Sequence, residues 1–326
     1  MNLALTALYS GLLLVGLCIP GFLLEKSGKL PPNMNKGLSM ILSYVAQPAI
    51  SIYSFQINEY RPGLLVNMGY VAIFSMVSML ISLLIGRLIF NKGFKEGVES
   101  KKRNEMRTLT ITSTFANCGF MGIPFLQELL PGNPEALLYT AVYMLFFNMF
   151  TWTIGIYIIT GDKKYINIKQ ILLNPPTLAL VVALPLFFTN TRLPGPLFSF
   201  LTHCQNLAAP ISMILMGVYL ARMNLKELVL DWRVYLTCAL KLVVAPIVMF
   251  LVSYPFIGQV GAIVVLTCFV IAGMPSATSN MYMNDMFGSL EGSKIAVKGV
   301  LMSTILSIVC VPLMLMLLSL VIPITL

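Results

Sequence analysis

Two short stretches of the chain combine helix-breaking residues with small polar side chains: NCGFMGIPF (117–125) and AGMPSATSN (272–280). The helix breakers are Gly119, Gly122 and Pro124 in the first stretch, and Gly273 and Pro275 in the second. Glycine weakens a helix, and proline removes an N–H donor. If both stretches unwind, each should free a helix N-terminus just after its proline, where unpaired N–H groups suit a carboxylate. The alternatives are a cation held by the freed carbonyls, and a packed proline kink without a ligand.

Other polar residues inside apolar runs are candidates for the same site. Asn117 and Asn148 carry neutral amides, which can donate to a carboxylate. They can equally make hydrogen bonds between helices. Gln47 and Ser51 lie on either side of Pro48 and are further candidates for a binding cavity. The remaining residues predicted to contact a ligand are Gly119, Ser276 and Thr278.

Lys241 is the one charged residue that falls well inside an apolar run. Its long side chain could extend to a membrane surface. The sharper prediction is that the Lys241 amino group is fixed near the two broken stretches. There it would donate hydrogen bonds to carbonyls at the ends of the broken helices, in place of a bound sodium ion. Uptake and release of a proton by this group is a third possibility. An ionisable residue at such a depth is by default a functional hypothesis.

The composition shows which kind of protein must position these residues. The chain has 326 residues, of which 58% are hydrophobic and 10% are charged, and its mean hydropathy is +0.87. Soluble domains carry about 25% charged residues, so a soluble enzyme, a disordered protein and a nucleic-acid binder are all disfavoured. The six cysteines lie in apolar stretches and predict neither a disulfide framework nor a metal site. The composition indicates an all-α polytopic protein of the lipid bilayer.

Apolar runs of the length that a bilayer requires divide the chain into ten predicted spans. Eighteen of the 21 Lys and Arg residues fall at one set of span ends, and only Arg61 and Arg192 fall at the other. Because cytoplasmic loops are enriched in Lys and Arg, both termini are expected outside the cytoplasm, in a protein of the plasma membrane. The spans are approximately 3–24, 34–56, 63–90, 107–130, 135–160, 175–190, 196–221, 233–256, 260–284 and 295–321.

Several features recur five spans apart, which predicts an internal repeat. YVAQPAIS (44–51) in span two corresponds to NLAAPISM (206–213) in span seven. The broken stretch of span four likewise corresponds to that of span nine. Because five is odd, the second copy enters the membrane from the opposite side, as in many secondary transporters. The predicted division is a first repeat over 1–160, a cytoplasmic linker over 161–174 and a second repeat over 175–326.

The order N-x-x-x-M-G-I-P from Asn117 to Pro124 resembles the auxin efflux carrier family, which includes PIN-type auxin carriers and bacterial malate and malonate permeases. The stretches YVAQPAIS, NMFTW (148–152), KLVVAP (241–246) and AGMPS (272–276) are similar to further motifs of that family. The resemblance implies ten helices in a 5+5 inverted repeat with crossed broken helices four and nine, as in sodium/proton antiporters and bile-acid symporters. It also implies a scaffold domain, a transport domain and often a homodimer. It places Asn117 and Asn148 at the substrate site and Lys241 at the family's basic position.

The expected function is a carrier that moves a small organic anion, such as malate, malonate or an auxin-like acid, by alternating access. The short linker 161–174 replaces the long central loop of many plant carriers and favours a small permease. No cofactor, metal or catalysis is expected, and proton coupling, sodium coupling and uniport all stay open. No Asp or Glu lies deep in a predicted span, which disfavours cation/proton antiport. The alternatives are a membrane sensor that kept the fold, and a channel-like facilitator.

Overall fold

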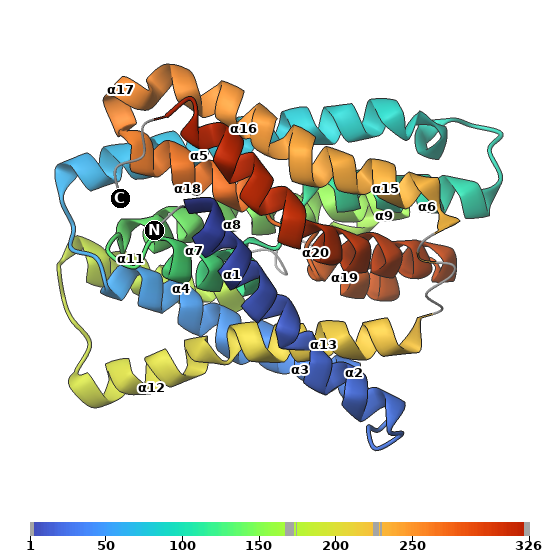
Figure 1. The fold of residues 1–326 in the computed structure, drawn as a ribbon, viewed down its shortest axis with the longest axis horizontal. Coiled ribbons are helices and arrows are strands. Elements are labelled where there is room, and N and C mark those ends of the chain that lie inside the picture. The colour runs from blue at the N-terminus through green and yellow to red at the C-terminus, as the bar shows by residue number, and fades with distance from the viewer. Residues whose placement is uncertain (1–2, 167–172, 174, 224–227, 229, 323–326) are drawn as a thin grey trace.

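The computed structural model describes residues 3–166, 173, 175–223, 228 and 230–322, and this part of the chain is helical with no β-sheet. In Figure 1, α12 and α13 run along one edge, and α5 with α15 and α16 runs along the opposite edge. The labels of α7, α18 and α19 lie between these edges. The helices of the first half are α1 (Leu3–Gly16), α2 (Cys18–Lys26), α3 (Met34–Ile41), α4 (Gln47–Gln56), α5 (Pro62–Ile89), α6 (Ser100–Thr114), α7 (Ile123–Leu129), α8 (Glu135–Phe150) and α9 (Ile156–Thr160).

The second half is built in the same manner from long and interrupted helices. Its described helices are α11 (Pro175–Phe188), α12 (Gly195–Asn206), α13 (Ala208–Arg222), α15 (Trp232–Ala239), α16 (Ala245–Ser253), α17 (Ile257–Val260), α18 (Ala262–Ala272), α19 (Ser279–Phe287) and α20 (Leu290–Ser319). Short 3₁₀ turns cover Asn91–Phe94, Lys163–Tyr165 and Tyr254–Phe256.

Seven helical segments of the described chain are long and apolar enough to cross a membrane. They are Ala4–Lys26, Met34–Gln56, Pro62–Ile89, Glu135–Thr160, Gly195–Arg222, Trp232–Val260 and Leu290–Ser319. Three predicted spans are absent from this set because they are short or interrupted. The segment 175–190 contributes only α11, while the segments 107–130 and 260–284 are each split into two helices. The structure therefore confirms a polytopic helical membrane protein, and the count of ten spans stays a prediction.

Wide π-helical turns precede three of the prolines inside the spans. They cover Leu42–Ala46, Cys118–Gly122 and Leu240–Val244, and they end two residues before Pro48, Pro124 and Pro246. A proline clashes with the carbonyl four residues earlier and cannot donate to it. A π turn adds one residue and relieves that clash, and such turns are often found at functional sites. A fourth π turn, Thr151–Gly155, joins α8 to α9.

Helices α2 and α13 contact each other through glycine. A Cβ atom on Gly21 would lie 2.0 Å from the carbonyl oxygen of Ile214, and one on Gly217 would lie 1.9 Å from that of Cys18. Small residues allow this close approach of backbones in membrane bundles. Larger side chains join α4 to α11, where the rings of Phe55 and Phe187 meet edge to face.

We expect Gly217→Val to lower the thermal midpoint of the purified protein strongly, because any side chain there collides with the backbone of α2. Overpacking of this kind costs about 1–3 kcal/mol or more. Gly69→Val is the matched control, because an added Cβ on α5 at Gly69 meets nothing within 4 Å. Equal midpoints for the two variants in a detergent unfolding assay would contradict the close contact.

Candidate functional site

The two broken segments cross and pair through their backbones. Between α6 and the π turn that precedes α7, residues 115–117 are non-helical, and Ala116 forms an isolated antiparallel bridge with Ser276. The amide of Asn117 donates to the carbonyl of Pro275 at 2.8 Å, and the amide of Ala277 donates to that of Phe115 at 2.9 Å. Non-helical backbone inside a bilayer must find such partners, because lipid supplies none.

Side chains complete the pairing at the crossing. The hydroxyl of Ser276 donates to the carbonyl of Thr112 at 2.7 Å, and the amide of Ser276 donates to the hydroxyl of Ser303 at 3.0 Å. Thr112 lies on α6 and Ser303 lies on α20. Ser276 therefore links the second broken stretch to two helices, and its hydroxyl already donates a hydrogen bond within the protein.

Lys241 reaches the crossing instead of a membrane surface. Its side chain is fully buried, and Nζ donates to the carbonyl of Ala272 at 2.7 Å and to that of Thr114 at 3.4 Å. These residues end α18 and α6, so one amino group caps the C-terminal ends of both half-helices. The C-terminal end of a helix carries partial negative charge, which a cation stabilises. Lys241 lies in the π turn Leu240–Val244, which Pro246 follows.

The first helix break does not lie where its glycines and its proline predicted it, whereas the second contains both Gly273 and Pro275. In the first segment the unwound stretch is 115–117, and Gly119 and Gly122 already belong to the π turn that precedes Pro124. In the second segment the chain is non-helical from Gly273, and α19 begins only at Ser279. The prediction of a helix N-terminus just after Pro124 is therefore wrong, because α7 begins at Ile123, whereas a helix does follow Pro275 and begins at Ser279. Proline is tolerated in the first turn of a helix, and Pro124 lies there in α7.

Several buried polar atoms near the crossing have no hydrogen-bond partner among the described residues. They include Asn117 Nδ2, Thr278 Oγ1, Ser279 Oγ and both polar side-chain atoms of Asn280. Asn280 is fully buried. An unpaired buried polar group costs about 1–3 kcal/mol, and most native groups avoid this cost. Asn117 and Thr278 to Asn280 flank the two non-helical stretches, so polar groups without partners gather where the helices are broken.

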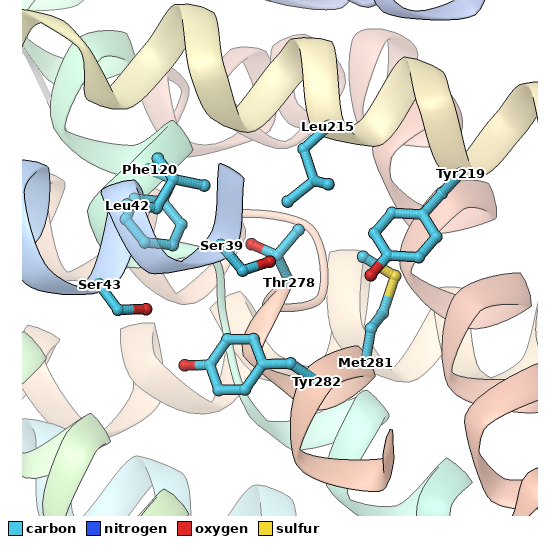
Figure 2. A pocket seen from close by; sticks show the side chains of 9 residues that line it. All are labelled: Ser39, Leu42, Ser43, Phe120, Leu215, Tyr219, Thr278, Met281 and Tyr282. Atoms are coloured by element: carbon cyan, nitrogen blue, oxygen red, sulfur yellow. The ribbon is translucent and has the colours of Figure 1, made fainter. Parts of the chain in front are cut away.

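A small cavity lies between the broken segments and two other parts of the bundle. Its volume is about 10 Å³, room for about one water molecule. In Figure 2, the side chains of Ser39, Thr278 and Tyr219 lie around its centre, with Tyr282 on one side and Leu215 on the other. The lining side chains come from α3 and the turn after it, from the π turn before α7, from α13 and from α19. The cavity is lined by hydroxyl, aromatic and aliphatic groups.

The described residues contain no group of three or more His, Cys, Asp or Glu side chains that could hold a metal ion. The buried polar residues of this part of the chain also include no Asp and no Glu. The charged clusters lie near helix ends, as where Arg233 contacts Glu105 and Asp231 at 2.7 Å each. The hydrogen bond from Arg233 lowers the pKa of the Asp231 carboxyl.

The sequence model of the family described as "Membrane transport protein", the auxin efflux carrier family, matches residues 9–315. The chain belongs to this family. A comparison with curated proteins found no match. The members are transporters and not enzymes, and the helical structure agrees with an integral membrane protein that carries a small molecule.

In this member of the auxin efflux carrier family, the predicted ligand contacts fall into three groups. Asn117, Gly119, Ser276 and Thr278 lie in or beside the crossing. Gln47 and Ser51 lie together on α4, where the hydroxyl of Ser51 donates to the carbonyl of Gln47 at 3.2 Å. Asn148 lies near the end of α8 and is 7% exposed. Of the predicted contacts, only Thr278 lines the small cavity.

In this family member, the small cavity is also lined by residues that the sequence patterns did not single out. Ser39 and Ser43 line the cavity from one face of the second predicted span, and Tyr219 and Tyr282 line it from two further helices. The i, i+4 spacing of the two serines places them on one helix face, and this signal could have been found. The two tyrosines gave no local signal, because what they face depends on how distant helices pack.

Proposed function

We propose that this auxin efflux carrier family member is a secondary transporter that moves a small organic anion with a carboxylate group by alternating access. The observation that carries the proposal is the pair of crossed, broken segments with unpaired amide and hydroxyl groups beside them. Asn117 would donate a hydrogen bond from Nδ2 to the carboxylate, and Thr278 would donate another from its hydroxyl. Asn148, Gln47, Ser51, Gly119 and Ser276 would line or shape the path in other conformations.

The proposed architecture has ten helices in two inverted repeats of five. Counting each broken segment as one span, and α11 as another, adds the three spans that the length criterion omits. Helices of the two repeats also pack against each other: α2 of the first repeat packs on α13 of the second, and α4 of the first packs on α11 of the second. We propose that α1–α4 and α11–α13 form a scaffold against which the other helices slide.

The proposed setting is the plasma membrane, with both termini outside the cytoplasm, and the proposed assembly is a homodimer. Orientation rests on the uneven distribution of Lys and Arg. For coupling, we propose that Lys241 takes the place of a cation at the crossing, so that membrane potential or a proton gradient drives transport instead of sodium.

The test is current across proteoliposomes on solid-supported membranes, with a panel of mono- and dicarboxylates added with and without sodium and a pH gradient. We expect a saturable, substrate-selective current. Asn117→Ala should reduce it about tenfold or more, the loss typical of one charge-assisted hydrogen bond. Asn91→Ala, which removes an exposed amide, should leave it unchanged.

Uptake of labelled carboxylates must accompany the current, because an electroneutral cycle produces none. Carboxylate binding without current or uptake would replace the proposal with a sensor. A flux that does not saturate would replace it with a channel-like facilitator. An unchanged flux in Asn117→Ala would remove this residue from the substrate site.

A further inference from the structure

A second, larger cavity lies at one end of the bundle, away from the helix crossing. Its volume is about 400 Å³, within the range of about 300–1,000 Å³ that is typical of small-ligand pockets. Its lining comes from the connection between α4 and α5, from the connection before α8, and from Arg192 between α11 and α12. The connections after α4 and after α11 lie at the same end of the molecule, on the left of Figure 1.

The basic residues of this cavity are exceptional in the chain. Arg61 and Arg192 both line it, and they are the only two Lys or Arg residues that the span assignment places outside the cytoplasm. Basic residues are disfavoured on that side of a membrane protein. Two such exceptions at one cavity indicate that its positive charge has a function, such as the binding of an anion.

The charges of the cavity are unequally matched. Glu59 pairs with Arg192 at 3.6 Å, and Arg192 Nη1 also donates to the carbonyl of Asn58 at 3.1 Å. Glu135 accepts a hydrogen bond from the hydroxyl of Tyr139 at 3.0 Å. Arg61 has no carboxylate within 4.0 Å among the described residues. Glu135 likewise has no basic partner within 4.0 Å among these residues, so the guanidinium of Arg61 is the one cationic group of the cavity lining without a carboxylate partner and is available to bind an anion.

Backbone groups add to the attraction for an anion. Helix α5 begins at Pro62, next to Arg61, whereas helix α8 begins at Glu135, whose own carboxylate already lies at that helix end. Helix N-termini carry partial positive charge, and a guanidinium binds a carboxylate through two parallel hydrogen bonds. We propose that this cavity is a second, peripheral binding site for a small carboxylate, with Arg61 as its main ligand.

The site lies across a contact that alternating access would have to break. Asn58 at the end of α4 donates through Nδ2 to the carbonyl of Pro134 at 3.0 Å, which joins the proposed scaffold to the connection before α8. A carboxylate held here is at the outer mouth of the proposed path. This role at the mouth rests on the proposed transport function, whereas binding itself does not.

The experiment uses a cysteine at Gly132, which lines the cavity and where an added Cβ meets nothing within 4 Å. The purified Gly132→Cys protein is reacted with a neutral maleimide–polyethylene glycol reagent in millimolar malonate, or in chloride at equal ionic strength. The protein without this cysteine measures the background from the native cysteines. We expect malonate to slow labelling several-fold.

Arg61→Gln in this background should weaken protection by malonate about tenfold or more, the loss typical of a charge-assisted contact. Lys95→Gln, which removes an exposed charge elsewhere, should leave protection unchanged. Labelling that malonate does not slow, or protection that survives Arg61→Gln, would overturn the site. A thermal midpoint recorded for each variant separates loss of binding from loss of fold.

Asn117→Ala distinguishes this inference from the transport proposal. If the peripheral site exists, malonate should still protect Gly132→Cys in that variant although uptake is strongly reduced. Protection without any carboxylate uptake in the otherwise unchanged protein would support the site and contradict the transporter. Carboxylate uptake without protection of the cysteine would support the transporter and contradict the peripheral site.

Discussion

Replacing Lys241 with glutamine is expected to reduce carboxylate uptake about a hundredfold, because two buried carbonyls lose a donor at about 1–3 kcal/mol each and 1.4 kcal/mol is a factor of ten. Nζ of Lys241 joins the ends of α6 and α18, and the shorter neutral side chain does not reproduce that geometry. The crossing would then rarely adopt the arrangement that aligns Asn117 and Thr278. The measurement is initial uptake in proteoliposomes, normalised to folded protein by size-exclusion chromatography.

Lys294→Gln is the matched control, because Lys294 is exposed near the start of α20, and its uptake should equal that of the unchanged protein. The same assay tests the coupling. Replacing sodium with choline should leave uptake by the unchanged protein intact, since an amino group already caps both helix ends. Uptake that requires sodium, or full uptake in Lys241→Gln, would contradict this role.

Asn280→Leu is expected to raise thermal stability while it lowers uptake about tenfold. Both polar side-chain atoms of Asn280 are buried and have no hydrogen-bond partner in the described part of the chain, so a leucine of similar size removes a cost of about 1–3 kcal/mol. A residue that destabilises one conformation is retained when another uses its hydrogen bonds, and active sites often show this trade-off. Thermal unfolding and uptake are measured on the same preparation.

Asn284 supplies the control, because it lies one turn further along α19 with both amide atoms bonded. Its Oδ1 accepts from the hydroxyl of Thr108 at 2.7 Å, and its Nδ2 donates to the carbonyl of Asn280 at 2.7 Å. Asn284→Leu should therefore lower stability. If both variants lost stability equally, Asn280 would be an ordinary structural amide.

The general position of the crossing could be predicted from the sequence, but its residues could not. Glycine and proline mark where a helix is weak, and both broken segments do contain them. The ends of the helices depend instead on the partner that satisfies the freed backbone, and that partner lies about 160 residues away in the chain, as for Ala116 and Ser276. Pro124 consequently lies in the first turn of α7 and not in the non-helical stretch.

The role of Lys241 could likewise be predicted only in part from the sequence. Its depth in an apolar run was readable from the sequence, but Thr114 and Ala272, the carbonyls that it caps, are adjacent to it only after folding. The same holds for Asn280, which stands among other small polar residues: that its side-chain amide is buried, with no hydrogen-bond partner among the described residues, is visible only in the folded protein. Burial and pairing are properties of the packed bundle and not of local composition.

The backbone pairing of residues 115–117 with residues 275–277 has a consequence for how the protein is made. The ribosome synthesises the first stretch long before the second, and until then the carbonyl of Phe115 and the amide N–H of Asn117 have no partner in lipid. The first broken segment therefore cannot settle in the bilayer as a finished unit during synthesis. The two segments must therefore insert together, late in synthesis. Until the second segment has been synthesised, the insertion machinery must keep the unpaired backbone groups of the first one out of contact with lipid.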